Sequence, residues 1–346
     1  MKYTKVHIDA IGYELAPVVI TSDELEERLA PALEKLHIPS GQIEALTGVS
    51  ERRWWAEGHQ LSDGAAAAAR KALAKSGVPG SEIGAVLYTG VCRELFEPAT
   101  ACRVASGLGV RPDAMIYDIS NACLGVLNGI LEVANRIELG QIRAGIVTSA
   151  ETARSIVEST IDHLLEFPRM ESFVQGLATM TGGSGAVAVV LTDGSFGGAG
   201  HRFRGAAVQA APEHHALCRW GLEAAQDHLM RPFMQTDAAA VLKHGLGLGK
   251  RTWQAFLGEV NWQSPQVDKV ICHQVGSAHQ EMILKELGIA PEKDFVTFPF
   301  LGNMGTVSLP ITAALAEERG FLKPGDRVGF LGIGSGLNCM MLGLEW

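Results

Sequence analysis

Cys123 is the residue of this sequence best placed for covalent chemistry. It lies in ISNACLGV (119–126), where the strand-like run AMIYDIS (114–120) meets a helix-like segment from 123 to 140. The unpaired N–H groups and positive dipole end of a helix favour a thiolate over a thiol, so we expect a reactive sulfur at this turn. The alternative is that Cys123 only packs, because cysteine is among the most buried residue types.

Two further polar residues stand where apolar segments end. His273 lies in KVICHQV (269–275), and Asn303 lies between glycines in FLGNMGTVSLP (300–310). An imidazole can stabilise a thiolate and move protons, and imidazole and amide N–H groups together can hold an oxyanion. With Cys123 they predict one pocket at strand ends. Taken singly, His273 can be a hydrogen-bonded core histidine and Asn303 a turn residue that tolerates positive φ.

Alternating strand-like and helix-like segments must position these residues. Helical segments follow Ser22 and Ser62, and 156–180 is interpreted as one or two helices that cover a core. A glycine-rich break at 191–205 predicts the boundary between two halves of an α/β fold. Continuous apolar runs, typical of strands buried on both faces, occur at 83–91, 114–120, 144–151, 183–191, 269–275 and 327–334.

Composition excludes several classes of protein. The 346 residues are 47% hydrophobic, enough for about two domains with large cores, and a formal net charge of -9 opposes nucleic-acid binding. The N-terminal stretch lacks the apolar core of a signal peptide and no run reaches ~20 apolar residues, so we expect a cytoplasmic protein without a membrane span. Six scattered cysteines without a CxxC pair predict free thiols and no metal site.

Two other stretches carry weaker signals. GLGLGK (245–250) lacks the preceding strand of a phosphate loop and is interpreted as an ordinary loop. Arg52, Arg53, Trp54 and Trp55 are adjacent and predict either a ledge for an adenine and phosphates or surface packing.

The motifs DISNACLG, HQV and GNMGTVSLPI together resemble the thiolase superfamily, and within it the beta-ketoacyl-ACP synthase III branch. TGVSERRWW (47–55), TGGSGAVAVVL (181–191) and KPGDRVGFLGIGSGLN (323–338) extend the similarity over nearly the whole chain. The resemblance implies a duplicated, thiolase-like five-layer αβαβα fold, with an N-terminal half of residues 1–195 and a C-terminal half of residues 196–346. It also implies a homodimer that needs no cofactor and takes acyl-CoA or acyl carrier protein (ACP) thioesters.

Within this resemblance each site residue acquires a role. Cys123 would carry the acyl group, and its backbone N–H with that of Gly336 would form the oxyanion contacts. His273 and Asn303 would hold the carbonyl of the second thioester.

The sequence departs from the fatty-acid-initiating pattern in HQVGSAH, which runs to His279, and in GNMGTVSLP. These segments resemble OleA-type enzymes, which join two fatty acyl-CoA molecules without decarboxylation. There Glu97, in ELFEPATA, would cross the dimer interface into the partner's site. Two plain acyl thioesters have no carboxylate to lose, so a base must remove an α-proton, and a desolvated carboxylate suits that task. The alternative is that Glu97, just before Pro98, only caps a helix.

Three hypotheses of different classes remain. The first is a thioester condensing enzyme, with decarboxylative use of malonyl-ACP or acyl transfer to an alcohol as variants of the chemistry. The second is a cysteine hydrolase, since Cys, His and Asn in this order also describe papain-like proteases, although the local CGSCW-type sequence is absent. The third is a non-catalytic relative with a vestigial site.

Overall fold

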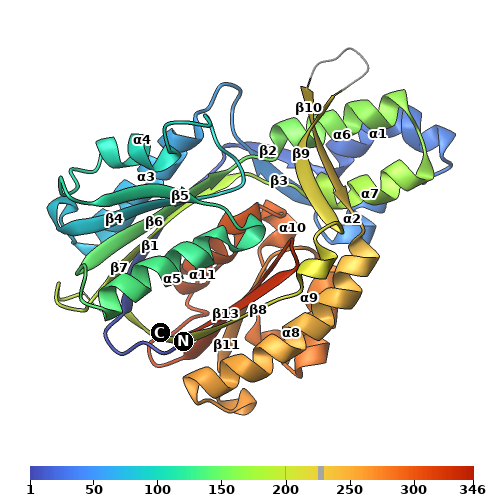
Figure 1. Cartoon of the computed structure of the whole chain (residues 1–346). Helices are drawn as coiled ribbons and strands as arrows, with labels where there is room; N and C mark the ends of the chain where they lie inside the picture. Colours follow the sequence, from blue (N-terminus) through green and yellow to red (C-terminus); the bar gives the residue numbers. More distant parts are fainter. Residues whose placement is uncertain (199, 225–229) are drawn as a thin grey trace.

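The computed structural model describes residues 1–198, 200–224 and 230–346 (Figure 1). Among these residues, nine strands form one sheet in the order β11-β12-β13-β8-β1-β7-β6-β4-β5. The strands of the first and second halves of the chain are grouped separately and meet where β1 pairs with β8. The bounds are β1 His7–Leu15, β4 Ile83–Thr89, β5 Met115–Ile119, β6 Ala144–Glu151, β7 Gly185–Thr192, β8 His201–Ala210, β11 Lys269–Cys272, β12 Arg327–Gly334 and β13 Asn338–Glu345.

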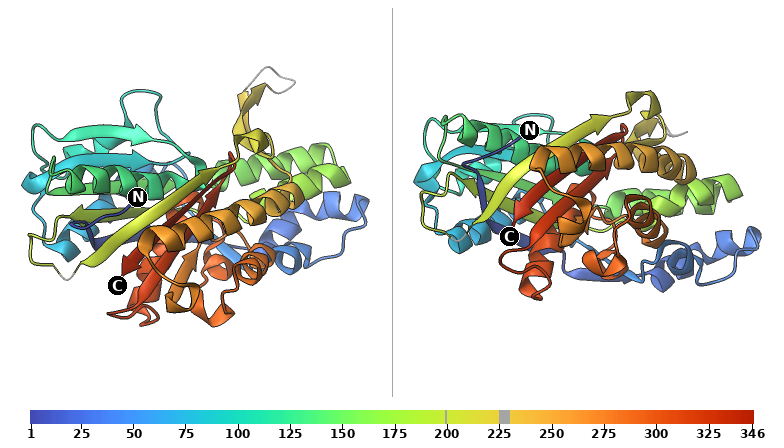
Figure 2. Two further views of the ribbon diagram at one scale, coloured as in Figure 1. Left: turned by 60° about the horizontal axis from the view of Figure 1, so that its bottom comes forward. Right: turned by 90° about the horizontal axis from the view of Figure 1, so that it is seen from below.

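Helices cover both faces of each half of the sheet. On the first half, α3 (Leu61–Ser76) packs on the outer face of β1, β6 and β7, together with α4 (Thr100–Ser106). Between the halves lie α5 (Gly125–Glu138) and α11 (Ser308–Glu318), whose apolar side chains join those of both groups of strands in one core. The outer face of the second half is covered by α8 (Ala238–Val260) and α9 (Ser277–Leu287), as Figure 2 shows for α8. The predicted α/β fold with five layers is confirmed.

The central strands form because their sequences are apolar without interruption. Every residue of β4, β6 and β7 is buried, as expected for strands covered on both faces. The predicted boundary between residues 195 and 196 falls in the segment that connects β7 to β8.

A smaller layer stands beside the main sheet (Figure 1). The stretch 156–180, predicted to cover a core, forms most of α6 (Arg154–Glu166) and all of α7 (Met170–Met180), which pack with α1 (Ser22–Lys35) around Trp54. The remaining elements are β2 Val18–Thr21, β3 Glu51–Trp54, β9 Cys218–Ala224, β10 Met230–Thr236, α2 Gln42–Thr47 and α10 Phe298–Leu301. Within the described ranges, none of the helices has the length and apolar character needed to cross a bilayer.

The interpretation of GLGLGK as a loop was wrong, because residues 245–250 lie inside α8. The glycines there allow close packing instead of a turn. A Cβ at Gly245 would lie 2.9 Å from Ile333 Cδ1, and one at Gly249 would lie 2.9 Å from Ile283 Cδ1. The absence of side chains thus brings α8 close to β12 and α9.

Candidate active site

Cys123 lies in a short 3-10 turn, Ala122–Leu124, that connects β5 to α5. Ala122 has a φ of +44°, in the left-handed region that costs a residue with a Cβ roughly 1–2 kcal/mol. The turn rests against the end of β12, since a Cβ at Gly334 would lie 3.4 Å from the Cys123 nitrogen. Cys123 is partly buried, whereas the next residue, Leu124, is fully buried.

The expectation of a thiolate stabilised by the helix is wrong for the unliganded protein. Burial of the Cys123 thiol, followed by the charges of Cys218 and Glu151, raises its pKa to about 12. The helix α5 begins two residues after the cysteine, and the Val126 N–H in its first turn donates to Thr306 Oγ1 at 2.7 Å. With its pKa this far above neutral, Cys123 is a thiol at pH 7, and Thr306 occupies one of the N–H donors at the start of α5.

His273 directly follows β11, and its backbone N–H donates to the Leu331 carbonyl of β12 at 2.9 Å. The residue is 6% exposed, and burial, with a smaller contribution from His279, lowers the pKa of the imidazole to about 3. The ring is therefore neutral at pH 7 and can donate one hydrogen bond. Gln274, which follows it, accepts the Thr297 N–H at 2.8 Å and so fixes the next loop.

Asn303 is held by its backbone. Its N–H donates to the Thr181 carbonyl at 2.8 Å, and its carbonyl accepts the Gly183 N–H at 2.9 Å. The side-chain Oδ1 accepts the Gly305 N–H at 3.0 Å. With Oδ1 occupied by this bond, the amide offers its Nδ2 N–H donors, which are the groups an oxyanion needs.

The structure brings three of the predicted segments together. The Asn303 loop joins the cysteine turn through the bond from Val126 to Thr306, and β11 ends beside β12, whose end contacts Cys123. Gly336 follows β12 with a φ of +141°, and Asn338 Nδ2 donates to Asn121 Oδ1 at 3.1 Å beside the cysteine turn.

Glu97 is the predicted residue that stays outside this assembly in a single chain. It is exposed, in the segment between β4 and α4. The backbone before Glu97 in this segment, at Val91 and Cys92, is hydrogen-bonded to Glu151.

Glu151 is a buried carboxylic acid that was not among the predicted site residues. It ends β6, is 3% exposed, and accepts the Val91 N–H at 2.9 Å and the Cys92 N–H at 3.1 Å. A Cβ at Gly305 would lie 3.6 Å from its Oε1, so it contacts the Asn303 loop as well. Burial raises the pKa of Glu151 to about 7. A glutamate at the end of a largely apolar strand was the feature of the sequence that could have indicated this residue.

The idea of an aromatic ledge for CoA is wrong for three of its four residues. Arg52, Trp54 and Trp55 are 0%, 1% and 7% exposed. The indole N–H of Trp54 donates to the Gly182 carbonyl at 3.2 Å, and that of Trp55 donates to the Glu151 carbonyl at 3.0 Å. These side chains support the loops of the site from inside. Among the described residues there is no cluster of three or more His, Cys, Asp or Glu side chains suited to a metal ion.

The fold and these three converging segments define a condensing enzyme of the thiolase superfamily. Residues 257–346 match the family described as 3-oxoacyl-[acyl-carrier-protein] synthase III C terminal. A beta-ketoacyl-[acyl-carrier-protein] synthase III of Rhodospirillum rubrum is 29% identical over 88% of this chain and 90% of that one. The chain is therefore an acyltransferase of the synthase III type.

Relatives of higher sequence identity place the chain in a smaller group within this family. An acyl-CoA:acyl-CoA alkyltransferase of Shewanella oneidensis is 61% identical over 100% of both chains, and one of Xanthomonas campestris is 35% identical over 100% of both. The cerulenin-bound structure of Xanthomonas campestris OleA superimposes with a TM-score of 0.94 at 34% identity, over 100% of this chain and 98% of that one. The chain belongs to the OleA-type acyl-CoA:acyl-CoA alkyltransferases.

Proposed function

We propose that the protein joins two acyl-CoA molecules by a non-decarboxylative Claisen condensation, with Cys123 as nucleophile and Glu97 as the base. The main support is the number of residues that separate Glu97 from Cys123. Solved variants of the Xanthomonas campestris OleA replace a glutamate or a cysteine, and the sequence separation of those two residues equals that of Glu97 and Cys123. A further variant of that protein, with its cysteine changed to serine, binds lauric acid and lauroyl-CoA.

In the first step the acyl group moves from CoA to the enzyme. The Cys123 sulfur attacks the thioester carbonyl, its proton leaves with the departing CoA thiolate, and an acyl-cysteine and free CoA result. Since burial holds the pKa of the thiol near 12, the proton must be transferred as the substrate binds and reacts. The N–H groups of Cys123 and Gly336 would hold the oxyanion of the tetrahedral intermediate.

In the second step a carbon–carbon bond forms. The Glu97 carboxylate of a second copy of the chain would take an α-proton from the second acyl-CoA, whose enolate oxygen is held by His273 and Asn303. The α-carbon attacks the acyl-cysteine carbonyl, the bond to sulfur breaks, and the cysteine thiolate regains a proton. A neutral imidazole suits this step, because it donates a hydrogen bond without a permanent charge.

A homodimer is part of this proposal because Glu97 is exposed and lies outside the pocket of its own chain. We further propose a cytoplasmic location and CoA rather than ACP delivery. Decarboxylative condensation with malonyl-ACP is the second candidate, and it is favoured by the similarity of residues 257–346 to the synthase III family.

The test uses lauroyl-CoA as the single substrate, with and without malonyl-ACP, and mass measurement of both protein and product. We expect an acyl group on wild-type protein, none on Cys123→Ala, and a product that contains both lauroyl chains without malonyl-ACP. Glu97→Gln should still be acylated but condense about 10²–10⁴-fold more slowly, since general-base catalysis contributes that much. Glu292→Gln, which changes an exposed carboxylate elsewhere, serves as the control. Full-rate condensation by Glu97→Gln would exclude Glu97 as the base, and a product that requires malonyl-ACP would favour the second candidate.

A further inference from the structure

The segment 90–99, here called the Glu97 loop, presents three consecutive exposed side chains. Phe96 is fully exposed, its neighbour Leu95 is 60% exposed, and Glu97 follows them. An apolar pair next to a carboxylate at the surface is typical of a contact region. A loop that carries a base into another subunit must leave its own chain in a fixed direction.

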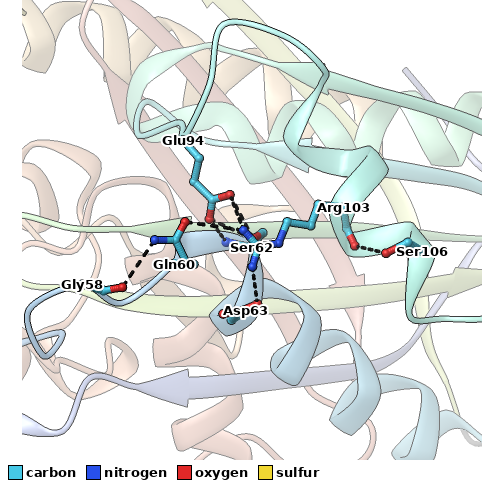
Figure 3. A network of polar contacts seen from close by, with 7 residues as sticks. All are labelled: Gly58, Gln60, Ser62, Asp63, Glu94, Arg103 and Ser106. Atoms are coloured by element: carbon cyan, nitrogen blue, oxygen red, sulfur yellow. Dashed lines mark hydrogen bonds and ion pairs between the residues drawn. The ribbon is translucent and has the colours of Figure 1, made fainter.

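Glu94 fixes the near side of this loop (Figure 3). Its Oε1 accepts the backbone N–H of Ser62 at 2.7 Å and the Ser62 hydroxyl at 2.8 Å. Ser62 is 1% exposed and lies in the first turn of α3, where N–H groups have no partner within the helix and a negative charge is favoured. Only 16% of the Glu94 side chain is exposed, so these bonds are partly protected from water.

Arg103 connects Glu94 to the far side of the loop. It lies on α4, after Glu97 in sequence, and its guanidinium is 3.3 Å from Glu94 Oε2 and 3.1 Å from Asp63 Oδ1. Arg103 itself is 51% exposed, so the ion pair adds little free energy, but it joins the two ends of the loop to the start of α3.

Two other carboxylates hold the backbone on either side of the loop. Glu151 binds the N–H groups of Val91 and Cys92, and Asp118 accepts those of Thr100 and Ala101 at 2.9 Å each. Cys92, at the first anchor, also donates its Sγ–H to the Thr152 carbonyl at 3.4 Å. Within residues 93–99, between the anchors, Glu94 is the only side chain with a described hydrogen bond to the body of the protein. It stands three residues before Glu97.

We infer that Glu94 is a positioning residue for the condensation step, which sets the direction of Glu97 and takes no part in acylation of Cys123. The inference rests on the proposed function. Removal of an α-proton requires the base within hydrogen-bond reach, and a displacement of about 1 Å can cost roughly 100-fold in rate. Acylation depends on the cysteine turn, which Glu94 does not contact.

The experiment compares two rates in one assay with lauroyl-CoA, the release of free CoA in the first turnover and the formation of the condensed product. We expect Glu94→Ala to lower the condensation kcat about 10- to 100-fold. The acylation rate should stay within about twofold of wild type, as for a change that does not touch the acylation machinery. Glu94→Gln, which keeps an acceptor for Ser62, should recover part of the loss. Asp113→Ala, which breaks another carboxylate–arginine pair, with Arg111, is the matched control and should leave both rates unchanged.

A double variant separates positioning from general destabilisation. If Glu94 acts through Glu97, adding Glu94→Ala to Glu97→Gln should have no further effect, because the base is already absent. The inference would be overturned if Glu94→Ala lowered the condensation rate as much in the Glu97→Gln background as in wild type. A loss of acylation as large as the loss of condensation in Glu94→Gln would also overturn it. Wild-type condensation by Glu94→Ala would overturn it too, while a full-rate Glu97→Gln variant would instead reject the proposed function.

Discussion

The proposed catalytic site and the Glu97 loop differ in the charge of their ionisable side chains. In the pocket, burial raises the pKa of Cys123 to about 12 and lowers that of His273 to about 3, so both are neutral at pH 7. On the loop, Glu94 and Arg103 form an ion pair at the edge of solvent. At neutral pH the proposed site therefore carries no charge on these two side chains, whereas the Glu97 loop holds a permanent ion pair.

The largest effect that would test this contrast is the reactivity of Cys123 toward iodoacetamide. A rise in pKa from 9.0 to about 12 leaves about 10³-fold less thiolate at pH 7 than an ordinary thiol would have. The alkylation rate of the unliganded protein should therefore keep rising from pH 7 to pH 10. Peptide mass spectrometry gives this rate, with exposed Cys102 as a reporter in the same sample. A plateau for Cys123 below pH 8 would mean that the thiolate is already formed.

A second, smaller effect concerns His273 and stability at acid pH. The folded-state pKa of about 3 lies below the ordinary 6.5, so the unfolded chain binds a proton that the folded protein excludes. The free energy of unfolding should fall as pH drops below 6.5, by at most about 1.4 kcal/mol per pH unit for this group. Urea unfolding at pH 7, 6 and 5 should show a shallower fall for His273→Asn. His37→Asn, at an exposed site, should keep the wild-type slope.

The smallest expected effect is on the pH dependence of stability and concerns Glu151, which contacts both the proposed site and the Glu97 loop. Its folded pKa of about 7 lies above the ordinary 4.5, so here the folded protein binds the extra proton. This group's contribution to stability is present below pH 4.5 and is lost as pH rises toward 7, opposite to the effect of His273. The variant Glu151→Gln should lack that decline relative to wild type, and Glu292→Gln should retain it. Identical pH slopes for wild type and Glu151→Gln would contradict a buried, protonated acid.

The buried strands and the site motifs could be predicted from the sequence, because each is marked by a local pattern of residues. β4 and β6 are continuous apolar runs, and Cys123, His273 and Asn303 all lie in turns directly after or between such segments. β1 was not predicted, because HIDAIGYEL interrupts its apolar residues with charged ones and its pairing partners lie in β7 and β8.

The protonation state of Cys123 could not be predicted, because it depends on how deeply the packing of segments far apart in the chain buries the thiol. Thr306 lies 180 residues from Val126, whose N–H it occupies, and no local pattern reports that contact. The anchoring of the Glu97 loop likewise requires both Ser62 and Arg103 to reach Glu94, which the packing of α3 beside α4 brings about.

The central position of β1 has a consequence for synthesis. This strand leaves the ribosome well before its partners, which are residues 185–192 of β7 and 201–202 of β8. At about 5–20 residues per second, these partners emerge roughly 10 to 40 seconds later. During that interval a nascent chain carries an unpaired strand that will form the middle of the finished sheet, so the sheet of the first half is complete only after β7 has been synthesised.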